Sequence, residues 1–297
     1  MSPTPSHAGF VDRQQVSRRF GRVARTYGEA DFFAREIDRR MQERLDFVTL
    51  EPKRVLDLGC SRGGSFPGLA TRYPDAQLIG LDVAPAMLAT GRMPRPGWQR
   101  WLGIGKPSEP FRIAADASNL PLKSRSTALV WSNLLLHWLD DPIPALAEAH
   151  RVLDVGGLLM FSTLGPDTLK ELRSSFVDGY AHTQRFADMH DLGDMVVGCG
   201  FADPVMDMEV VTLTYDDLDA LFAELRAAGS TCAMKARRHC LTGRQTWAAG
   251  RAAYEAMRQG GKLPATFEVI YGHAWKTAPK QTQDGRAIIR FDLPRKP

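Results

Sequence analysis

The stretch Val55-Leu-Asp-Leu-Gly-Cys-Ser-Arg-Gly-Gly64, followed by Leu78-Ile-Gly-Leu-Asp82, decides the fold. An apolar run ends in a turn of small residues, and a second apolar run ends in a carboxylate. This order is typical of a strand–turn–helix–strand unit that presents a nucleoside to the backbone. The two acids are 82 − 57 = 25 residues apart, a suitable length for one such repeat. Glycine lets the main chain approach a ligand closely, and Asp82 stands where a carboxylate accepts hydrogen bonds from ribose hydroxyls.

Two interpretations of this turn fit it less well. Gly59, Ser61 and Gly64 match G-x-G-x-x-G with one mismatch, but a carboxylate at Asp57 would repel the pyrophosphate of a dinucleotide. Gly59-Cys-Ser-Arg-Gly63 also matches G-x-S-x-G, the nucleophile elbow of serine hydrolases. Fewer than 60 residues precede it, and they contain no His-Gly-Gly-Gly oxyanion segment. A triad base could still come from one of three histidines: His137, His150 and His190.

S-adenosylmethionine (SAM) fits the turn better, because it carries no phosphate and its methionine end is cationic. Asp57 can hold the glycine turn and lie near that cation. A third acid, Asp116 in Ile113-Ala-Ala-Asp-Ala-Ser-Asn-Leu-Pro121, stands where an adenine amino group is expected. Each acid alone could be a helix cap or close a turn. Three acids in this order favour SAM.

The composition is that of a soluble globular chain with a sizeable core. The 297 residues are 44% hydrophobic and 24% charged, and the net charge of +4 does not imply nucleic acid. The four cysteines show no C-x-x-C spacing, and no apolar run is long enough for a signal peptide or a membrane span, so we expect a reducing, cytoplasmic location. Two basic clusters are either solvated faces or docking sites for an acidic partner. They are Arg13, Arg18, Arg19, Arg22 and Arg25, and Lys235, Arg237, Arg238, His239 and Arg244.

Short apolar runs alternate with helical spans from Arg54 onward, which predicts an α/β fold with a parallel sheet. Strands are expected at 55–58, 78–81, 111–114, 128–131, 158–162, 205–214 and 266–275, and helices at 167–176, 192–197, 216–228 and 245–258. The domain boundaries follow: a disordered N-terminus (1–12), a helical cap (13–48), the SAM-binding core (49–215), a helical lid insertion covering the pocket (216–263), the last strand of the core (264–276) and a flexible tail (277–297). Asp57, Asp82, Asp116 and Ser132-Asn133 all fall at carboxyl ends of strands, where ligands of parallel sheets bind.

This layout resembles the class I SAM-dependent methyltransferases, whose seven-stranded, mostly parallel Rossmann-like sheet has a reversed last strand. The turn of that superfamily is usually D-x-G-x-G-x-G, and Ser61 replaces its middle glycine. The resemblance implies SAM as cofactor. It places the SAM contacts at Asp57, Gly59, Ser61, Gly63, Asp82, Val83, Met87, Asp116, Ala117 and Asn133.

Four longer segments resemble the malonyl-acyl-carrier-protein O-methyltransferases of biotin synthesis. They are Trp131-Ser-Asn-Leu-Leu-Leu-His-Trp138, Phe161-Ser-Thr-Leu-Gly-Pro-Asp-Thr-Leu-Lys-Glu-Leu-Arg173, Asp188-Met-His-Asp-Leu-Gly193 and Leu263-Pro-Ala-Thr-Phe-Glu-Val-Ile-Tyr-Gly-His-Ala-Trp275. The Phe20, Ala24 and Tyr27 pattern also resembles the first helix of that family. The resemblance implies methylation of a malonyl carboxylate, with an acidic acyl carrier protein as partner.

The same resemblance suggests roles for individual residues. Tyr27, Asn133 and His137 are the catalytic candidates. Trp138, Arg173 and His190 are candidates for binding the substrate. No His, Asp and Glu grouping in the sequence indicates a metal site. A sister group, the methyltransferase-like assembly factors of respiratory complex I that are linked to arginine hydroxylation, shares the Ser-Asn-Leu-x-Leu-His-Trp and Pro-Ala-Thr segments and remains an alternative. Another small-molecule SAM methyltransferase is a further one.

Overall fold

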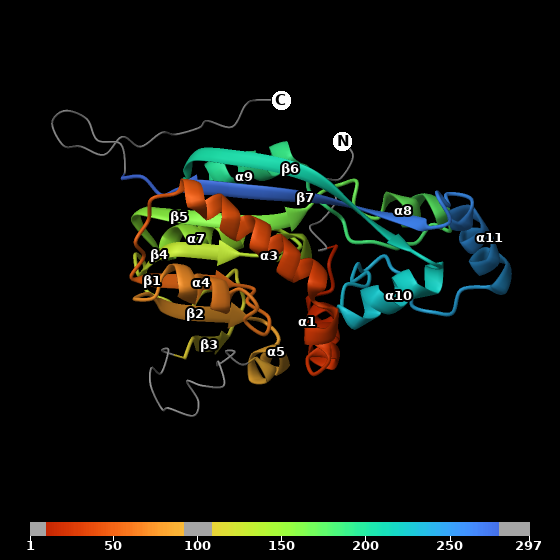
Figure 1. Ribbon diagram of the computed structural model, residues 1–297, viewed down its shortest axis with the longest axis horizontal. Helices are drawn as coiled ribbons and strands as arrows, with labels where there is room; N and C mark the ends of the chain where they lie inside the picture. The colour runs from red at the N-terminus through yellow and green to blue at the C-terminus, as the bar shows by residue number, and fades with distance from the viewer. Residues whose placement is uncertain (1–9, 92–108, 279–297) are drawn as a thin grey trace, which may run out of the picture.

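A computed structural model describes residues 10–91 and 109–278, and within them one seven-stranded sheet forms the centre of the molecule (Figure 1). The strands are β1 (Arg54–Leu58), β2 (Gln77–Asp82), β3 (Phe111–Ala114), β4 (Thr127–Ser132), β5 (Leu153–Leu164), β6 (Ala202–Tyr215) and β7 (Leu263–Trp275). Their order in the sheet is β3-β2-β1-β4-β5-β7-β6. Strands β1 to β5 run parallel, and β7 runs antiparallel to both β5 and β6. The predicted α/β fold with a reversed last strand is confirmed.

Strand β5 begins earlier than expected. The sequence predicts a strand at 158–162, but the strand begins at Leu153 and contains both Gly156 and Gly157. Gly156 has a φ of +82°, and the pairing of β4 with β5 shifts register between Thr127 and Leu129. The two glycines therefore form an irregularity within the strand, where a residue without Cβ accommodates the unusual backbone.

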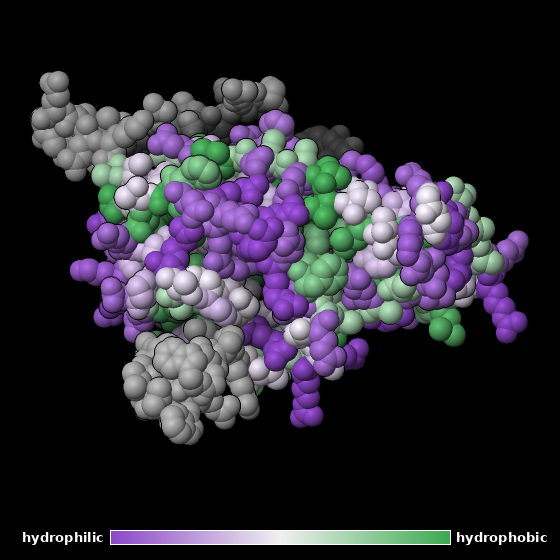
Figure 2. Space-filling view, viewed as in Figure 1, coloured by the Kyte–Doolittle hydropathy of each residue, from purple (hydrophilic) through white to green (hydrophobic). Residues whose placement is uncertain are grey.

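Helices cover both faces of the sheet and its far end. The helices in the described part of the chain are α1 (Arg13–Val23), α2 (Tyr27–Ala30), α3 (Phe32–Arg44), α4 (Phe66–Arg72), α5 (Pro85–Thr90), α7 (Ile143–Val152), α8 (Lys170–Ser175), α9 (Met189–Gly198), α10 (Leu218–Ala227) and α11 (Arg244–Glu255), with 3-10 turns η1 (Leu45–Phe47) and η2 (Leu136–Trp138). On one face of the sheet, apolar residues of α3 and α4 pack with Val55, Leu129 and Leu158. On the other face, apolar residues of α7 and α9 pack with strand residues that point the opposite way, such as Leu56. This follows from the alternation of side chains along a strand. The outward face of α3 is hydrophilic (Figure 2).

Residues 10–12 contact the rest of the fold. Val11 is buried and pairs with Met234 in an isolated antiparallel bridge, and the Asp12 carboxylate accepts a hydrogen bond from the Gln15 N–H at the start of α1. The predicted disorder of residues 1–12 is therefore wrong for residues 10–12. Residues 1–9 lie outside the described part of the chain, as does the predicted tail from residue 279 onward.

Strands β6 and β7 extend beyond the parallel strands, and α8, α10 and α11 pack around their far end (Figure 1). Leu172, Leu221, Tyr254 and Phe267 belong to this separate apolar cluster. The insertion predicted as a lid corresponds to α10, α11 and the segment between them. Helix α10 lines the main cavity, whereas α11 contacts α8 and α10. None of the helices described here is long and apolar enough to cross a membrane.

Candidate active site

The glycine turn after β1 lies against the end of β2. The N–H groups of Gly59 and Cys60 donate to the Leu81 carbonyl at 2.8 and 3.0 Å, and the Ser61 N–H donates to Asp82 Oδ2 at 2.9 Å. Gly63 has a φ of +86°, and a Cβ there would collide with the Phe66 ring. The turn thus needs glycine at Gly63 for two reasons, and it brings Asp57 and Asp82 to one end of a cavity.

Three carboxylates gather at this end: Asp57 and Asp38 are buried, and Asp82 is half-buried. Asp57 is 1% exposed, and burial, followed by the nearby charges of Asp38 and Asp82, raises its pKa well above the usual value. Burial also raises the pKa of Asp38, which accepts a hydrogen bond from the Trp131 indole at 3.0 Å. Burial raises the pKa of Asp82 as well, against hydrogen bonds from backbone N–H groups. A cation bound here would relieve the repulsion among these groups.

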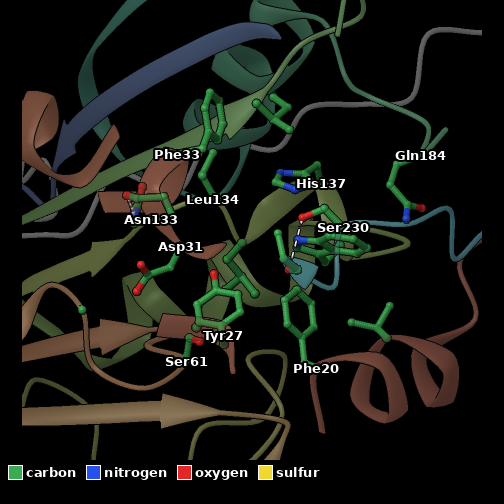
Figure 3. A pocket seen from close by; sticks show the side chains of 18 of the residues that line it. Phe20, Tyr27, Asp31, Phe33, Ser61, Asn133, Leu134, His137, Gln184 and Ser230 are labelled. Atoms are coloured by element: carbon green, nitrogen blue, oxygen red, sulfur yellow. Dashed lines mark hydrogen bonds between the residues drawn. The ribbon is translucent and has the colours of Figure 1, made fainter. Parts of the chain in front are cut away.

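The cavity has a volume of about 730 Å³ and two chemically different ends. Asp31, Tyr27, Ser61 and Asn133 gather toward one end, and His137, Gln184 and Ser230 lie toward the other (Figure 3). Large apolar side chains line the space between and beyond them. They are Phe20, Phe33, Leu134, Leu135, Leu164, Leu169, Leu172, Phe186, Phe222, Leu225 and Phe267.

The residues at the acidic end fit SAM. Asp57 Oδ2 is buried and has no hydrogen-bond partner, so it is available to a cationic donor such as the SAM amino group. Each Asp82 oxygen accepts one backbone N–H, from Ser61 or from Ala84, which leaves acceptor capacity for ribose hydroxyls. The glycine turn provides the close backbone approach that this ligand needs. The cavity lining also includes six other predicted SAM contacts: Gly59, Ser61, Gly63, Val83, Ala117 and Asn133.

Two predicted SAM contacts differ from expectation. Met87 is fully buried and packs with Ala24 and Ala84 instead of lining the cavity. Asp116 does line the cavity, but its Oδ2 is paired with Arg13 at 2.9 Å, and its Oδ1 accepts from Ser118. An adenine amino group that binds Asp116 would therefore have to share the carboxylate with Arg13 or displace the Arg13 guanidinium.

Helix α1 and the short helix α2 form one wall of the cavity. The Phe20 ring packs edge-on against Tyr27 and Trp138, with centroids 6.3 and 5.2 Å away. Burial and the nearby Asp31 carboxylate raise the pKa of Tyr27 to about 12. Tyr27 is therefore a neutral phenol at pH 7, which can donate a hydrogen bond but carries no charge.

Asn133 and His137 follow β4 and line the cavity. Both polar groups of the Asn133 amide are hydrogen-bonded within the protein. Nδ2 donates to the Ala34 carbonyl at 2.8 Å, and Oδ1 accepts from the Ser162 hydroxyl at 2.7 Å. His137 Nδ1 lies 3.3 Å from the Thr163 hydroxyl, and burial lowers the pKa of its imidazole to about 3. His137 is consequently uncharged at pH 7 and a weak base.

Of the predicted substrate residues, the cavity contains only Trp138. The Arg173 guanidinium donates instead to the carbonyls of Pro166 and Thr168, and so holds the loop before α8. The side chain of His190 is 87% exposed and pairs with Asp188 at the start of α9. The structure therefore does not support a carboxylate-binding role for Arg173 or His190.

The sequence did not reveal one wall of the cavity. Residues 182–184 lie where the sequence predicts no helix or strand, and residues 230–232 lie in the insertion, yet both segments line the cavity beside α10. Neither segment carries a motif or a periodicity, so no local signal could have identified them. Among residues 10–91 and 109–278, no group of three or more His, Cys, Asp or Glu side chains is arranged to hold a metal ion.

Known proteins share this fold. Residues 56–161 match the model of a methyltransferase domain family. Two solved structures are similar over 81% of this chain and 99% of their own: the YcgJ protein of Bacillus subtilis, at 15% identity and a TM-score of 0.55, and a putative methyltransferase of Bacillus halodurans C-125, at 14% identity and a TM-score of 0.56. The fold and the site define a class I SAM-dependent methyltransferase, and SAM is its cofactor.

More similar relatives narrow the class. A protein of Gallionella capsiferriformans (strain ES-2) is 47% identical over 282 residues, which are 94% of this chain and 96% of the relative. A protein of Laribacter hongkongensis (strain HLHK9) is 47% identical over 294 residues, which are 96% of this chain and 98% of the relative. Both are named malonyl-[acyl-carrier protein] O-methyltransferase, and this chain belongs to that family. The resemblance predicted from the sequence is confirmed, and the assembly-factor alternative is not favoured.

Proposed function

We infer that this chain transfers a methyl group from SAM to the free carboxylate of malonyl-acyl carrier protein and so forms a methyl ester. The observation that carries this proposal is a cavity whose acidic end suits a cationic cofactor and whose remaining walls are largely apolar. The names of the relatives supply the malonyl substrate. The place of this reaction in biotin synthesis and in the cytoplasm remains a prediction from the resemblance.

Methyl transfer to a carboxylate needs no proton transfer by the protein. Bound SAM supplies a methyl group on a positively charged sulfur, which takes the bonding electron pair when the methyl leaves. A malonyl carboxylate is already ionised at pH 7, so no general base is needed. The neutral states of His137 and Tyr27 agree with this. The chain's contribution is to align the carboxylate with the methyl group and to exclude water, through walls such as Phe33 and Trp138.

The carboxylate still needs a basic side chain that selects it. Two side chains that line the cavity are candidates in place of Arg173 and His190: Arg226 near the end of α10 and His182. His182 Nε2 lies 2.7 Å from Asp178 Oδ1, and Asp178 Oδ2 accepts from Arg238 at 3.1 Å. This pairing fixes the His182 ring, which also packs on Phe176. We expect His182→Ala or Arg226→Ala to raise the KM for malonyl substrates without changing the affinity for SAM.

The direct test of the function is transfer of labelled methyl from SAM to malonyl-acyl carrier protein, with acetyl-acyl carrier protein as the control. Methylation of the malonyl form alone is the expected result. If SAM binds but neither carrier protein is methylated, the proposal fails.

The two basic clusters of the sequence lie together in space, and we propose this surface as the docking site for an acidic carrier protein. Lys235 N–H donates to the Phe10 carbonyl at 2.7 Å, and Arg237 pairs with Asp12 at 3.2 Å. Arg19 on α1 donates to the Thr231 carbonyl. The exposed basic residues Arg18, Arg22, Arg25 and Lys235 surround these contacts. Opposite charge across such a surface steers association.

Charge reversal tests the docking surface. The double variant Arg18→Glu/Arg22→Glu should raise the KM for malonyl-acyl carrier protein at least tenfold at low salt and by much less at high salt, because salt screens exposed charges. The matched control is Lys53→Glu/Lys123→Glu, which changes the net charge equally at exposed positions preceding β1 and β4, at the opposite end of the sheet. Equal effects of the two variants would contradict the assignment.

A further inference from the structure

Two chain segments without regular structure meet beside the cavity and form a narrow wall. Cys232 Sγ lies 3.4 Å from the Ala181 carbonyl oxygen and 3.2 Å from that of Thr183. Gln184 Nε2 donates to the Thr231 carbonyl at 3.2 Å. Both segments line the cavity, the first through His182, Thr183 and Gln184 and the second through Ser230, Thr231 and Cys232.

One polar atom in this wall is unused. Gln184 is 7% exposed, and its Oε1 is buried without a hydrogen-bond partner. The orientation of the amide is fixed, because exchanging its oxygen and nitrogen would set an oxygen against the Thr231 carbonyl oxygen. A buried acceptor left without a donor costs free energy in the empty cavity, so its presence in the cavity wall points to a ligand that brings an N–H or O–H group.

The position of Gln184 indicates which ligand brings that donor. Figure 3 shows Gln184 on the far side of the cavity from Tyr27, Asp31 and Ser61, the end that fits SAM. The same wall continues into the basic surface, since the Ala181 N–H donates to the Ala236 carbonyl at 3.1 Å and Met234 pairs with Val11. A chain that enters from the docked carrier protein and reaches the methyl group must pass this wall.

We propose that Gln184 Oε1 accepts a hydrogen bond from an amide N–H of the pantetheine arm that carries the malonyl thioester. The arm is a sequence of amide groups joined by short alkyl links, so it needs a few polar partners in an otherwise apolar passage. Gln184 supplies one such partner, and Phe222 and Leu225 supply apolar surface in the same cavity. The inference rests on the proposed function, because it presumes a malonyl thioester on such an arm.

Two small substrates isolate this hydrogen bond. One is the malonyl thioester of N-acetylcysteamine, which contains the amide nearest the sulfur. The other is its analogue in which CH₂ replaces the amide N–H. We expect the wild-type protein to prefer the amide substrate about tenfold in kcat/KM, because the analogue leaves the buried Gln184 oxygen unpaired. The variant Gln184→Met has a similar volume and no acceptor, and it should treat the two substrates alike.

The ratio of the two kcat/KM values separates recognition from a structural role. A variant that only loosened the wall would lose activity on both substrates and keep the wild-type preference, which would overturn the inference. Absence of a preference in the wild-type protein would overturn it too. The control Gln77→Met, at the start of β2 and outside the cavity lining, should keep the wild-type ratio. Malonyl-acyl carrier protein is assayed in parallel: a wild-type protein that methylates it but shows no preference between the small substrates, or acts on neither, overturns the inference alone, whereas failure to methylate the carrier protein would refute the proposed function as well.

Discussion

Ser61 holds its backbone in the left-handed region, with a φ of +52°, at the position where the superfamily turn has glycine. A side chain in that region costs roughly 1–2 kcal/mol relative to glycine. The strain persists because the Ser61 N–H is held by Asp82 and the turn is held by the β2 strand end. The substitution of serine for glycine therefore affects stability and leaves the course of the chain unchanged.

We expect Ser61→Gly to raise the free energy of unfolding by up to about 1 kcal/mol, since relief of strain is partly offset by the greater freedom of glycine in the unfolded chain. Urea unfolding measures this. Ser124→Gly, at an exposed position outside the left-handed region, is the control and should give no gain. A loss of stability in Ser61→Gly would show that the Ser61 side chain contributes more than its backbone strain costs.

Asp57 gives a second prediction at the residue scale. Burial raises its pKa in the free protein, so the acid holds its proton to a higher pH than an exposed aspartate does, whereas a cationic ligand favours the carboxylate. SAM binding should therefore release protons, and the Kd for SAM should fall as the pH rises. Calorimetry in buffers of different ionisation enthalpy detects the release. Asp57→Asn should bind SAM more weakly and with much less pH dependence, and a pH-independent Kd in the wild-type protein would contradict this account.

At the scale of elements, Asn133 connects three parts of the fold. It follows β4, receives a hydrogen bond from Ser162 on β5 and donates one to Ala34 in α3. The sequence suggested a catalytic role, but both ends of its amide are occupied by the protein. The carboxyl end of β4 and the cap helix α3 are thereby fixed relative to each other around the cavity.

Asn133→Ala should lower the free energy of unfolding by about 2–3 kcal/mol, because two hydrogen bonds are lost and the buried Ser162 hydroxyl is left without its acceptor. Thermal and urea unfolding measure the effect. We expect the Kd for SAM to rise along with this loss, because the wall of the cavity shifts. An Asn133→Ala protein of wild-type stability with a strongly reduced kcat would instead restore the direct catalytic role.

At the scale of the whole molecule, the pH dependence of stability should record the burial of His137. Its pKa falls from 6.5 to about 3 on folding, so the native state holds the neutral imidazole and the unfolded chain takes up a proton below pH 6.5. The stability contributed by neutral His137 is therefore complete above pH 6.5 and is lost as the pH falls toward 3.

The measurement compares wild type with His137→Phe. Over this pH range the wild-type free energy of unfolding should decrease more steeply, by up to about 1.4 kcal/mol for each pH unit. The other titrating groups are common to both proteins and cancel in the difference. Parallel curves would mean that His137 is accessible to protons in the folded state.

Much of the molecule could be predicted because its signals are local. Alternating apolar runs indicated the seven strands, and Asp57, Asp82, Asp116 and Asn133 were placed at the cavity because carboxyl ends of parallel strands share one edge. The same reasoning failed for Arg173 and His190. Their residue types suggested a site that binds a carboxylate. The Arg173 guanidinium instead donates to the Pro166 and Thr168 carbonyls, and the His190 side chain on α9 faces solvent.

The sequence by itself determined the parallel sheet, the glycine turn and the acids that follow its strands, because each depends on residues within one strand–helix unit. Only the tertiary structure decided that residues 182–184 and 230–232 form a wall of the cavity, that the two basic clusters make one surface and that Asn133 is bound on both sides. These features join residues tens to hundreds of positions apart. Such contacts arise when separate elements pack, and no pattern within either segment encodes them.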